Sequence, residues 1–335
     1  MSGTDSLRCA VRLTPSTRLA WLPLAFPLER GGVLDDGRLA YELSGPDDGP
    51  LVIVLGGISA GRHVAAHPDD PRPGFFDALV GSGGAIDTTR VRVLGVDFLG
   101  GVGGSSGPLD LPAAATFPEV TTGDQADAIA CLLDHLSVAC AHAVVGASYG
   151  GMVALALASR HPTRARRLVV IGAADRPDPL ASAWRSVQRR IVALGAGHGQ
   201  AREGLALARA LAMASYRGRD ELAARFADDP AGLETYLHAR GTAFAATFDP
   251  EAFVVLSRSI DLHRIDPVSV TVPTTLVAFR SDQLVPVTQV RALASALGGP
   301  CDLVELDSPF GHDAFLKEAA ALAPILRGAT AGGGR

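Results

Sequence analysis

The sequence lacks the features that mark disulfide-rich, metal-clustered or membrane-spanning proteins. Its four cysteines, Cys9, Cys131, Cys140 and Cys301, show no CxxC or Cys/His metal spacing. No segment reaches the roughly 18 unbroken apolar residues that a membrane-spanning helix needs. The N-terminal segment has no continuous apolar region followed by a small-residue cleavage site. We therefore expect a reduced protein of the cytoplasm that binds no metal and no membrane.

An excess of basic charge is also absent. The 30 Lys and Arg against 35 Asp and Glu give a formal net charge of -5 and an isoelectric point near 6.0, so nucleic acid is not an expected partner. Charged residues make up 19% of the chain and hydrophobic residues 47%. A chain of 335 residues with this composition can bury a large core, and its target is expected to be a small molecule.

Short apolar runs alternate with longer segments whose apolar residues have helical spacing. Residues 39–43 predict an edge strand, and six further runs predict buried parallel strands, at 51–57, 91–98, 142–148, 167–174, 274–279 and 301–306. Helices are expected at 124–136, at 287–297 and directly after Ser148. This alternation predicts an α/β fold with a mostly parallel, doubly wound sheet.

One long region has no strand signal. Residues 175–265 contain only helical sequence rich in Ala, Leu and Arg, and an insertion of this size between two strands predicts a helical lid over the active site. The core is expected at 26–174 and 266–335, and residues 1–25 as a poorly ordered extension.

The sequence Gly146-Ala147-Ser148-Tyr149-Gly150 matches G-x-S-x-G between a predicted strand and a predicted helix, the context that this nucleophile motif requires. A chain with 38 glycines can produce the pattern by chance, so the motif alone does not establish a nucleophile. The Gly-rich segment GGVGGSSGP is not a phosphate-binding loop, because it lacks the Lys-Ser/Thr ending.

Two later residues occupy the places of a base and its orienting acid. Asp282 follows the predicted strand 274–279, and His312 follows the strand 301–306, in the chain order Ser, Asp, His. Alone, Asp282 could cap a turn and His312 could lie in a surface loop, but their joint placement favours a triad. His312 would take the Ser148 proton, and Asp282 would stabilise the imidazolium.

A serine nucleophile also needs donors for the oxyanion. The backbone N–H of Tyr149 is the first candidate, and the N–H of Ile58, in the Gly-rich loop after the strand that starts at Leu51, is the second. An ordinary Gly-rich turn is the alternative interpretation of that loop.

Several segments between about Phe26 and the C-terminus carry a family resemblance, namely GASYGGMVALALASRHP, GGVGGSSGP, FPEVTTGDQADAI, WRSVQRR, ASYRGRDELAARF, SRSIDLHRID and SPFGHDAFLKE. In these segments the chain resembles the MetX-type homoserine O-acyltransferases. The resemblance implies the α/β-hydrolase fold, a homodimer, and a ping-pong transfer from acyl-CoA to the hydroxyl of L-homoserine in methionine biosynthesis. It also implies that Arg217 and Asp313 contact the amino-acid acceptor.

The acyl donor is expected to be succinyl-CoA, with acetyl-CoA as the alternative. A buried succinyl carboxylate needs a cationic partner, and Arg185 stands where acetyl-using relatives usually carry a neutral residue. Arg189 lies one turn further along, and Arg62 is a second candidate. These arginines could instead be solvated or bind CoA phosphates.

Three alternatives stay open at this point. L-serine differs from homoserine by one methylene, which a pocket distinguishes only modestly. A serine ester hydrolase would share the triad and the fold. A binding module on an inactive hydrolase fold would usually lack a triad member, and this sequence has all three.

Overall fold

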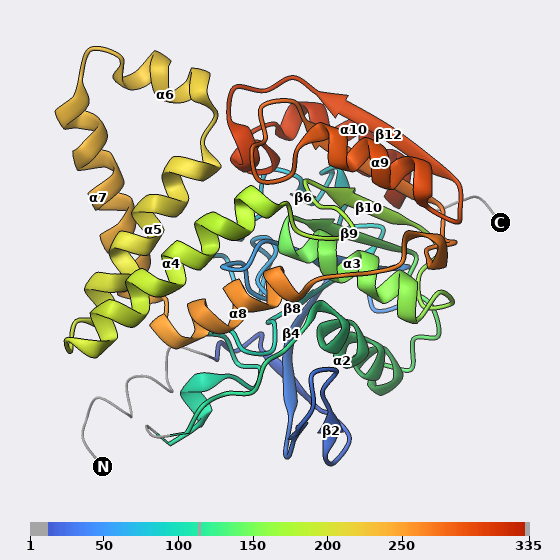
Figure 1. Cartoon of the computed structure of the whole chain (residues 1–335). Coiled ribbons are helices and arrows are strands. Elements are labelled where there is room, and N and C mark those ends of the chain that lie inside the picture. The colour runs from blue at the N-terminus through green and yellow to red at the C-terminus, as the bar shows by residue number, and fades with distance from the viewer. Residues whose placement is uncertain (1–12, 113–114, 332–335) are drawn as a thin grey trace.

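A single eight-stranded sheet forms the centre of the computed structural model, which describes residues 13–112 and 115–331 (Figure 1). Strand β4 pairs antiparallel with β1 and β8, and all other neighbours pair in parallel. The prediction of a mostly parallel sheet is confirmed. In spatial order the strands are β1 (Arg18–Trp21), β4 (Arg38–Ser44), β8 (Arg92–Val96), β5 (Leu51–Leu55), β9 (Ala143–Ala147), β10 (Leu168–Ile171), β11 (Thr274–Phe279) and β12 (Cys301–Leu306).

The structure corrects two details at the N-terminal side of the sheet. Residues 39–43 were expected at an edge, but β4 is an inner strand because β1 pairs along its outer side. Residues 1–25 were expected as a poorly ordered extension, whereas Arg18–Trp21 form that outer strand. Residues 1–12 of the expected extension lie outside the described part of the chain.

Apolar side chains cover both faces of the sheet, and the strand pleat divides them. In β5, Ile53 belongs to a cluster shared with α2 and α3, whereas Val52 and Val54 belong to a second cluster shared with α10. This double burial explains why the inner strands are continuous apolar runs. The helices that flank the sheet are α2 (Thr122–His135), α3 (Tyr149–Arg160), α9 (Val287–Ala296) and α10 (Ala319–Thr330).

Five helices between β10 and β11 occupy the region for which the sequence predicts a lid, and we call them the lid. Three of them begin with Asp-Pro, at Asp178, Asp229 and Asp249, where the carboxylate accepts backbone N–H groups and proline occupies the first helical position. Figure 1 shows these helices, in yellow-green to orange, projecting from one side of the sheet. They are α4 (Pro179–Gly197), α5 (Ala201–Tyr216), α6 (Arg219–Phe226), α7 (Pro230–Thr247) and α8 (Pro250–Leu262).

The remaining elements are short. Two small ribbons pair β2 with β3 and β6 with β7. Their bounds, with those of three 3-10 turns, are β2 (Phe26–Pro27), β3 (Val33–Leu34), β6 (Val80–Gly81), β7 (Ile86–Asp87), η1 (Pro108–Asp110), η2 (Pro267–Ser269) and η3 (Gly311–Leu316).

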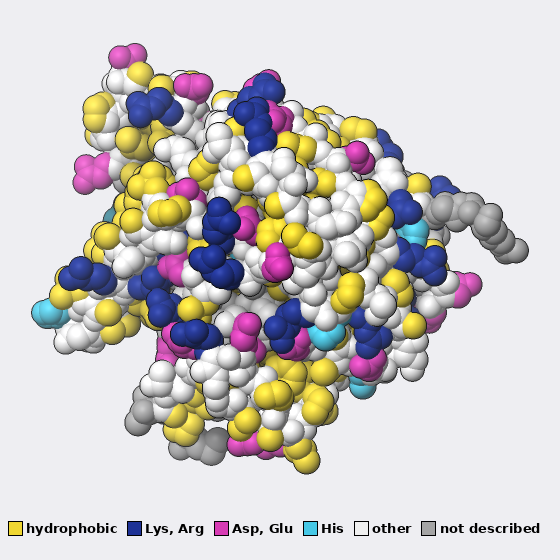
Figure 2. Space-filling view, turned by 45° about the vertical axis from the view of Figure 1, so that its right-hand side comes forward, with side chains coloured by type: hydrophobic (Ala, Val, Ile, Leu, Met, Phe, Trp, Pro, Cys, Tyr) yellow, Lys and Arg dark blue, Asp and Glu magenta, His cyan; other side chains and the backbone are white. Residues whose placement is uncertain are grey.

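The surface is mixed in charge. Figure 2 shows Lys and Arg side chains beside Asp and Glu side chains over one face of the molecule, as the small net charge leads one to expect. None of the helices in the described ranges has both the length and the apolar character needed to cross a bilayer.

Candidate active site

Ser148 lies at the sharp turn between β9 and α3. Its backbone has φ 54° and ψ -120°, a strained conformation for a residue other than glycine. Both motif glycines are required by packing at this turn. A Cβ on Gly146 would lie 2.3 Å from the Gly150 carbonyl oxygen, and one on Gly150 would lie 2.3 Å from that of Leu55. The G-x-S-x-G sequence therefore follows from how tightly the turn packs.

Ser148, His312 and Asp282 form a continuous hydrogen-bonded chain. Ser148 Oγ lies 2.7 Å from His312 Nε2, and His312 Nδ1 lies 2.7 Å from Asp282 Oδ2. The other carboxylate oxygen of Asp282 accepts the backbone N–H groups of Leu284 and Val285, at 2.8 and 3.0 Å. These bonds hold Asp282 as an acceptor, so Nδ1 of the imidazole carries its proton and Nε2 is free to accept that of serine.

The environment of His312 favours its role as a base. Burial alone would lower the pKa of His312, but the carboxylates of Asp282 and Asp313 together outweigh burial and raise that pKa above its ordinary value. A more basic imidazole is a stronger acceptor for the serine proton.

The expected oxyanion donors lie at the same place. Ile58 and Tyr149 both line the cavity that contains Ser148. The N–H of Gly150 donates to the carbonyl of Gly56 at 2.9 Å and so ties the loop after β5 to the start of α3. A Cβ built on Gly57 would lie 4.0 Å from Ser148 Cβ, which shows how closely this loop approaches the nucleophile.

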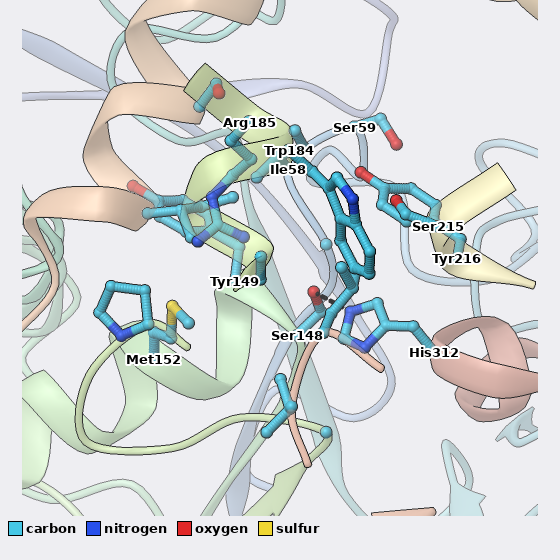
Figure 3. Close-up of a pocket in the computed structure, with 18 of the residues that line it drawn as sticks. Ile58, Ser59, Ser148, Tyr149, Met152, Trp184, Arg185, Ser215, Tyr216 and His312 are labelled. Atoms are coloured by element: carbon cyan, nitrogen blue, oxygen red, sulfur yellow. Dashed lines mark hydrogen bonds between the residues drawn. The ribbon is translucent and has the colours of Figure 1, made fainter. Parts of the chain in front are cut away.

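The cavity above the serine is small and roofed by the lid. Its volume is about 90 Å³, which suits a short acyl group and a small amino acid. Figure 3 shows Trp184 and Arg185 of α4 and Tyr216 of α5 around the bonded Ser148 and His312. Met152 lines the core side. Lid and core therefore enclose Ser148 and His312 together.

Arg217 and Asp313 are brought together, as the family resemblance implied. Arg217 Nη2 lies 3.5 Å from Asp313 Oδ2, and Arg217 also pairs with Glu221. Asp313 lines the cavity, whereas Arg217 lies behind it, and its buried Nε has no hydrogen-bond partner within the described residues. Burial raises the pKa of Asp313, while Arg217 and His312 oppose that shift.

Two glycines lock the lid against the catalytic loop next to this pair. A Cβ on Gly218 would lie 2.0 Å from the carbonyl oxygen of Pro309. Gly311 has φ 61°, and a Cβ there would lie 2.5 Å from the Tyr216 carbonyl oxygen. The segment that carries Arg217 is thus fitted directly to the loop that carries His312.

The lid arginines share a carboxylate that the sequence analysis did not single out. Arg185 Nε and Arg189 Nη1 each lie 2.7 Å from a different oxygen of Asp261, on α8. Arg185 lines the cavity. Arg62, the second candidate, is instead buried against Asp97 in the core and does not line this cavity.

Sequence reasoning also missed Trp184 and Arg209, which line the cavity. The guanidinium of Arg209 lies over the rings of Tyr216 and Phe244, at 5.2 and 4.5 Å from their centroids. Helical periodicity shows that α4 and α5 are helices but not which polar side chains turn toward the serine, so no signal in the single sequence identified these residues.

Known proteins share both the sequence and this architecture. The family described as alpha/beta hydrolase fold matches residues 50–319. A homoserine O-succinyltransferase of Xanthomonas campestris pv. campestris is 46% identical, over 86% of this chain and 78% of that protein. A serine O-succinyltransferase of the same organism is 35% identical, over 93% of this chain and 96% of that one. The crystal structure of a homoserine O-acetyltransferase from Staphylococcus aureus has a TM-score of 0.80 at 28% identity, covering 93% of this chain and 94% of that one.

Proposed function

The chain belongs to the α/β-hydrolase family and, within it, to the homoserine and serine O-acyltransferases, and we propose that it is a homoserine O-succinyltransferase. The reaction transfers the succinyl group of succinyl-CoA to the side-chain hydroxyl of L-homoserine. It serves methionine biosynthesis, and its need for an acyl-CoA donor is the reason to assign it to the cytoplasm. Succinyl-CoA is a co-substrate of this reaction and not a resident cofactor.

In the first half-reaction, Ser148 Oγ attacks the thioester carbonyl and gives its proton to His312 Nε2. The Ile58 and Tyr149 N–H groups stabilise the oxyanion of the tetrahedral intermediate. The C–S bond then breaks, the CoA sulfur takes the proton from His312, and an acyl-Ser148 ester remains. The 2.7 Å contact between Ser148 and His312 supports this step.

In the second half-reaction, His312 removes the proton from the homoserine hydroxyl, which attacks the ester carbonyl. The bond between the acyl carbon and Ser148 Oγ then breaks, and Oγ takes the proton back from His312. Arg217 would bind the α-carboxylate of homoserine, and Asp313 would accept from its ammonium group. The two side chains are 3.5 Å apart and pair with each other. A zwitterion offers each of them a partner of the opposite sign, which orients the hydroxyl toward the ester.

The charged pair beside His312 is the observation that favours a transferase over a hydrolase. Asp313 directly follows His312 in the chain, and Arg217 is held beside it with one buried N–H group unused. An ester hydrolase needs no ammonium and carboxylate receptors at its base. Water lacks both charges, so such a pair would give it no orientation.

Arg185 supports succinyl over acetyl as the group transferred. It lines the cavity and acts on His312 electrostatically: like burial it lowers the imidazole pKa, against the larger opposite effect of Asp282. The distal carboxylate of a succinyl group would compete with Asp261 for this guanidinium. An acetyl group has no charge with which to do so.

The decisive experiment combines succinyl-CoA or acetyl-CoA with L-homoserine or L-serine and follows the release of free CoA. We expect the fastest release with succinyl-CoA and homoserine. With succinyl-CoA alone, the intact enzyme should gain about 100 Da, the mass of one succinyl group on a serine. Ser148→Ala should abolish both signals, while Ser159→Ala, on the same helix, should retain them.

Three outcomes would contradict the proposal. Transfer of acetyl but not succinyl would overturn the donor, and faster transfer to L-serine would overturn the acceptor. CoA release at an equal rate without any amino acid would indicate a hydrolase.

We also propose that the protein is a homodimer joined through the lid. Leu180, Val187 and Leu194 of α4 are spaced seven residues apart on one helix face and are 54%, 50% and 65% exposed. Light scattering should report a dimer that Leu194→Glu dissociates. Val268→Glu, at a similarly exposed residue outside the lid, should leave the dimer intact. A monomeric wild-type protein would contradict the proposal.

A further inference from the structure

A second cluster of chemically reactive side chains lies outside the catalytic cavity. Glu42 on β4 meets His63 and His67, which lie in the loop segment after β5. Their ligand atoms all lie within 4.8 Å of one another. His63 Nδ1 lies 2.8 Å from Glu42 Oε1, and His67 Nε2 contacts the same oxygen. Neither histidine lines the cavity that contains Ser148.

The hydrogen bonds of His63 cannot be satisfied by a neutral ring. Its Nε2 lies 2.7 Å from the carbonyl oxygen of Arg72, and its Nδ1 faces the Glu42 carboxylate. Both partners are acceptors, whereas a neutral imidazole donates from only one nitrogen. A cation must therefore lie at Nδ1, either a proton or a metal ion.

We propose that Glu42, His63 and His67 form a binding site for a divalent transition metal, with Zn²⁺ as the best match. One carboxylate and two imidazoles are ligands that zinc takes in proteins. Ligand atoms around a tetrahedral zinc are about 3.3 Å apart. The contact of 2.8 Å between His63 and Glu42 would open by about half an ångström on binding, and the shorter contact of His67 with Glu42 would open further. The ion would bind His63 Nδ1, His67 Nε2 and the Glu42 carboxylate.

The groups around these ligands are those that metal sites use to orient them. The Arg72 carbonyl accepts from His63 Nε2, which leaves Nδ1 as the nitrogen with a free lone pair. The second oxygen of Glu42 accepts from Ser16 Oγ at 3.0 Å. Such outer contacts fix the tautomer and the rotamer before an ion arrives.

The local charge also favours a cation. Glu42 is 4% exposed, and Asp70 Oδ2 lies 3.8 Å from His63 Nδ1, where it can serve as a fourth ligand. Arg72 pairs with the same carboxylate, so the ion would share Asp70 with this guanidinium. His63 also lines a surface hollow of about 510 Å³, through which an ion can enter.

The site would join two separate parts of the core. Glu42 belongs to the sheet, whereas His63 and His67 follow the oxyanion loop that contains Ile58. A bound ion would fix this loop to β4 and so stabilise it without contacting substrate. The expectation of no metal site rested on cysteine and histidine spacing alone, which cannot reveal a carboxylate 21 residues before its first histidine partner.

The test uses the full-length protein without a histidine tag, stripped with a chelator and dialysed against Zn²⁺. Elemental analysis should find about one zinc per chain, and zinc should raise the melting temperature of the stripped protein. His63→Gln and His67→Gln should each lose the bound zinc and the thermal shift. The control His198→Gln, at an exposed lid histidine, should retain both.

Co²⁺ provides a measurement on the wild-type protein that does not depend on how the variants fold. Bound at this site, it should give the intense visible absorption of a tetrahedral ion, and added Zn²⁺ should abolish it. Zinc retained equally by the variants would overturn the site. So would a wild-type protein that retains no zinc and whose His63 NMR signals show a doubly protonated ring.

Discussion

The two ends of the active-site cavity are built in opposite ways. At the core end, the hydrogen bonds from Asp282 through His312 to Ser148 run in one direction, and the carboxylate is held by backbone donors. At the lid end, charged side chains pair with one another, Arg185 with Asp261 and Arg217 with Asp313. The core end is one chain of directed hydrogen bonds, whereas the lid end consists of ion pairs.

This difference suggests separate tasks for the two ends: the core end for acyl transfer and the lid end for the choice of substrate. A triad on rigid strand ends serves any acyl transfer, including hydrolysis, and does not identify the acceptor. A buried arginine without a partner would be costly, and each of these arginines pairs with a carboxylate, Asp261 of the lid or Asp313 beside His312. The contrast predicts that core variants lose turnover while lid variants lose discrimination.

The largest effect is expected at the core end, from Asp282→Asn. The amide cannot stabilise the imidazolium and favours the wrong tautomer, so kcat should fall by about 10³ to 10⁴ with little change in KM. The matched control is Asp266→Asn, because Asp266 also caps a turn by accepting a backbone N–H two residues on. CoA release measures both. A loss at Asp282 no larger than at Asp266 would show that Asp282 is only a turn cap.

A large but different effect is expected at the lid from Arg217→Gln. Loss of a charge-assisted bond to the α-carboxylate should raise the KM for homoserine by about 100-fold. The first burst of CoA release should be unchanged, because acyl-enzyme formation does not use this residue. Arg217→Lys should recover part of the affinity, and the exposed Arg219→Gln should have no effect. If the variant lost the burst as well as its affinity for homoserine, Arg217 would support the fold and not bind the substrate.

The contrast between the ends also describes what a sequence can reveal. The strands, the Ser148 turn and the order of the triad were predictable because buried apolar runs and Gly-x-Ser-x-Gly are local patterns. Strand β4 was wrongly expected at an edge because β1 is short and largely exposed, with only Ala20 of its four residues buried, and gives little periodic signal. Local sequence patterns therefore predicted almost all of the core end of the site.

The lid end depended on information that one sequence does not contain. Arg217 and Asp313 were predicted as site residues only through the family resemblance. Asp261, Arg209 and Trp184 were not predicted as site residues. Asp261 meets Arg185 from 76 residues away, and the pairing depends on how α4 and α8 cross. The cluster of Glu42, His63 and His67 was not predicted for the same reason, because its members come from a strand and from a separate loop.

A moderate effect is expected from pH and belongs to the core end. His312 must be neutral to accept the serine proton, and its pKa is raised by Asp282 despite burial. The active form is the deprotonated one, so kcat/KM for the acyl donor should fall about tenfold per pH unit below a pKa higher than that of an ordinary histidine. In Asp282→Asn this acid limb should move to lower pH, and an unmoved limb would assign it to another group.

The smallest effect is expected from Arg185→Asn, and it tests selection alone. Removing one cation from the distal carboxylate should lower kcat/KM for succinyl-CoA about tenfold relative to acetyl-CoA, because Arg189 remains one helix turn away. Arg190→Asn, at the exposed neighbouring arginine, should leave the ratio of the two donors unchanged. Equal losses with both donors would mean that Arg185 binds the CoA portion or supports the lid. Only the two residues proposed to contact the acceptor, Arg217 and Asp313, would then support the assignment of substrate selection to the lid end.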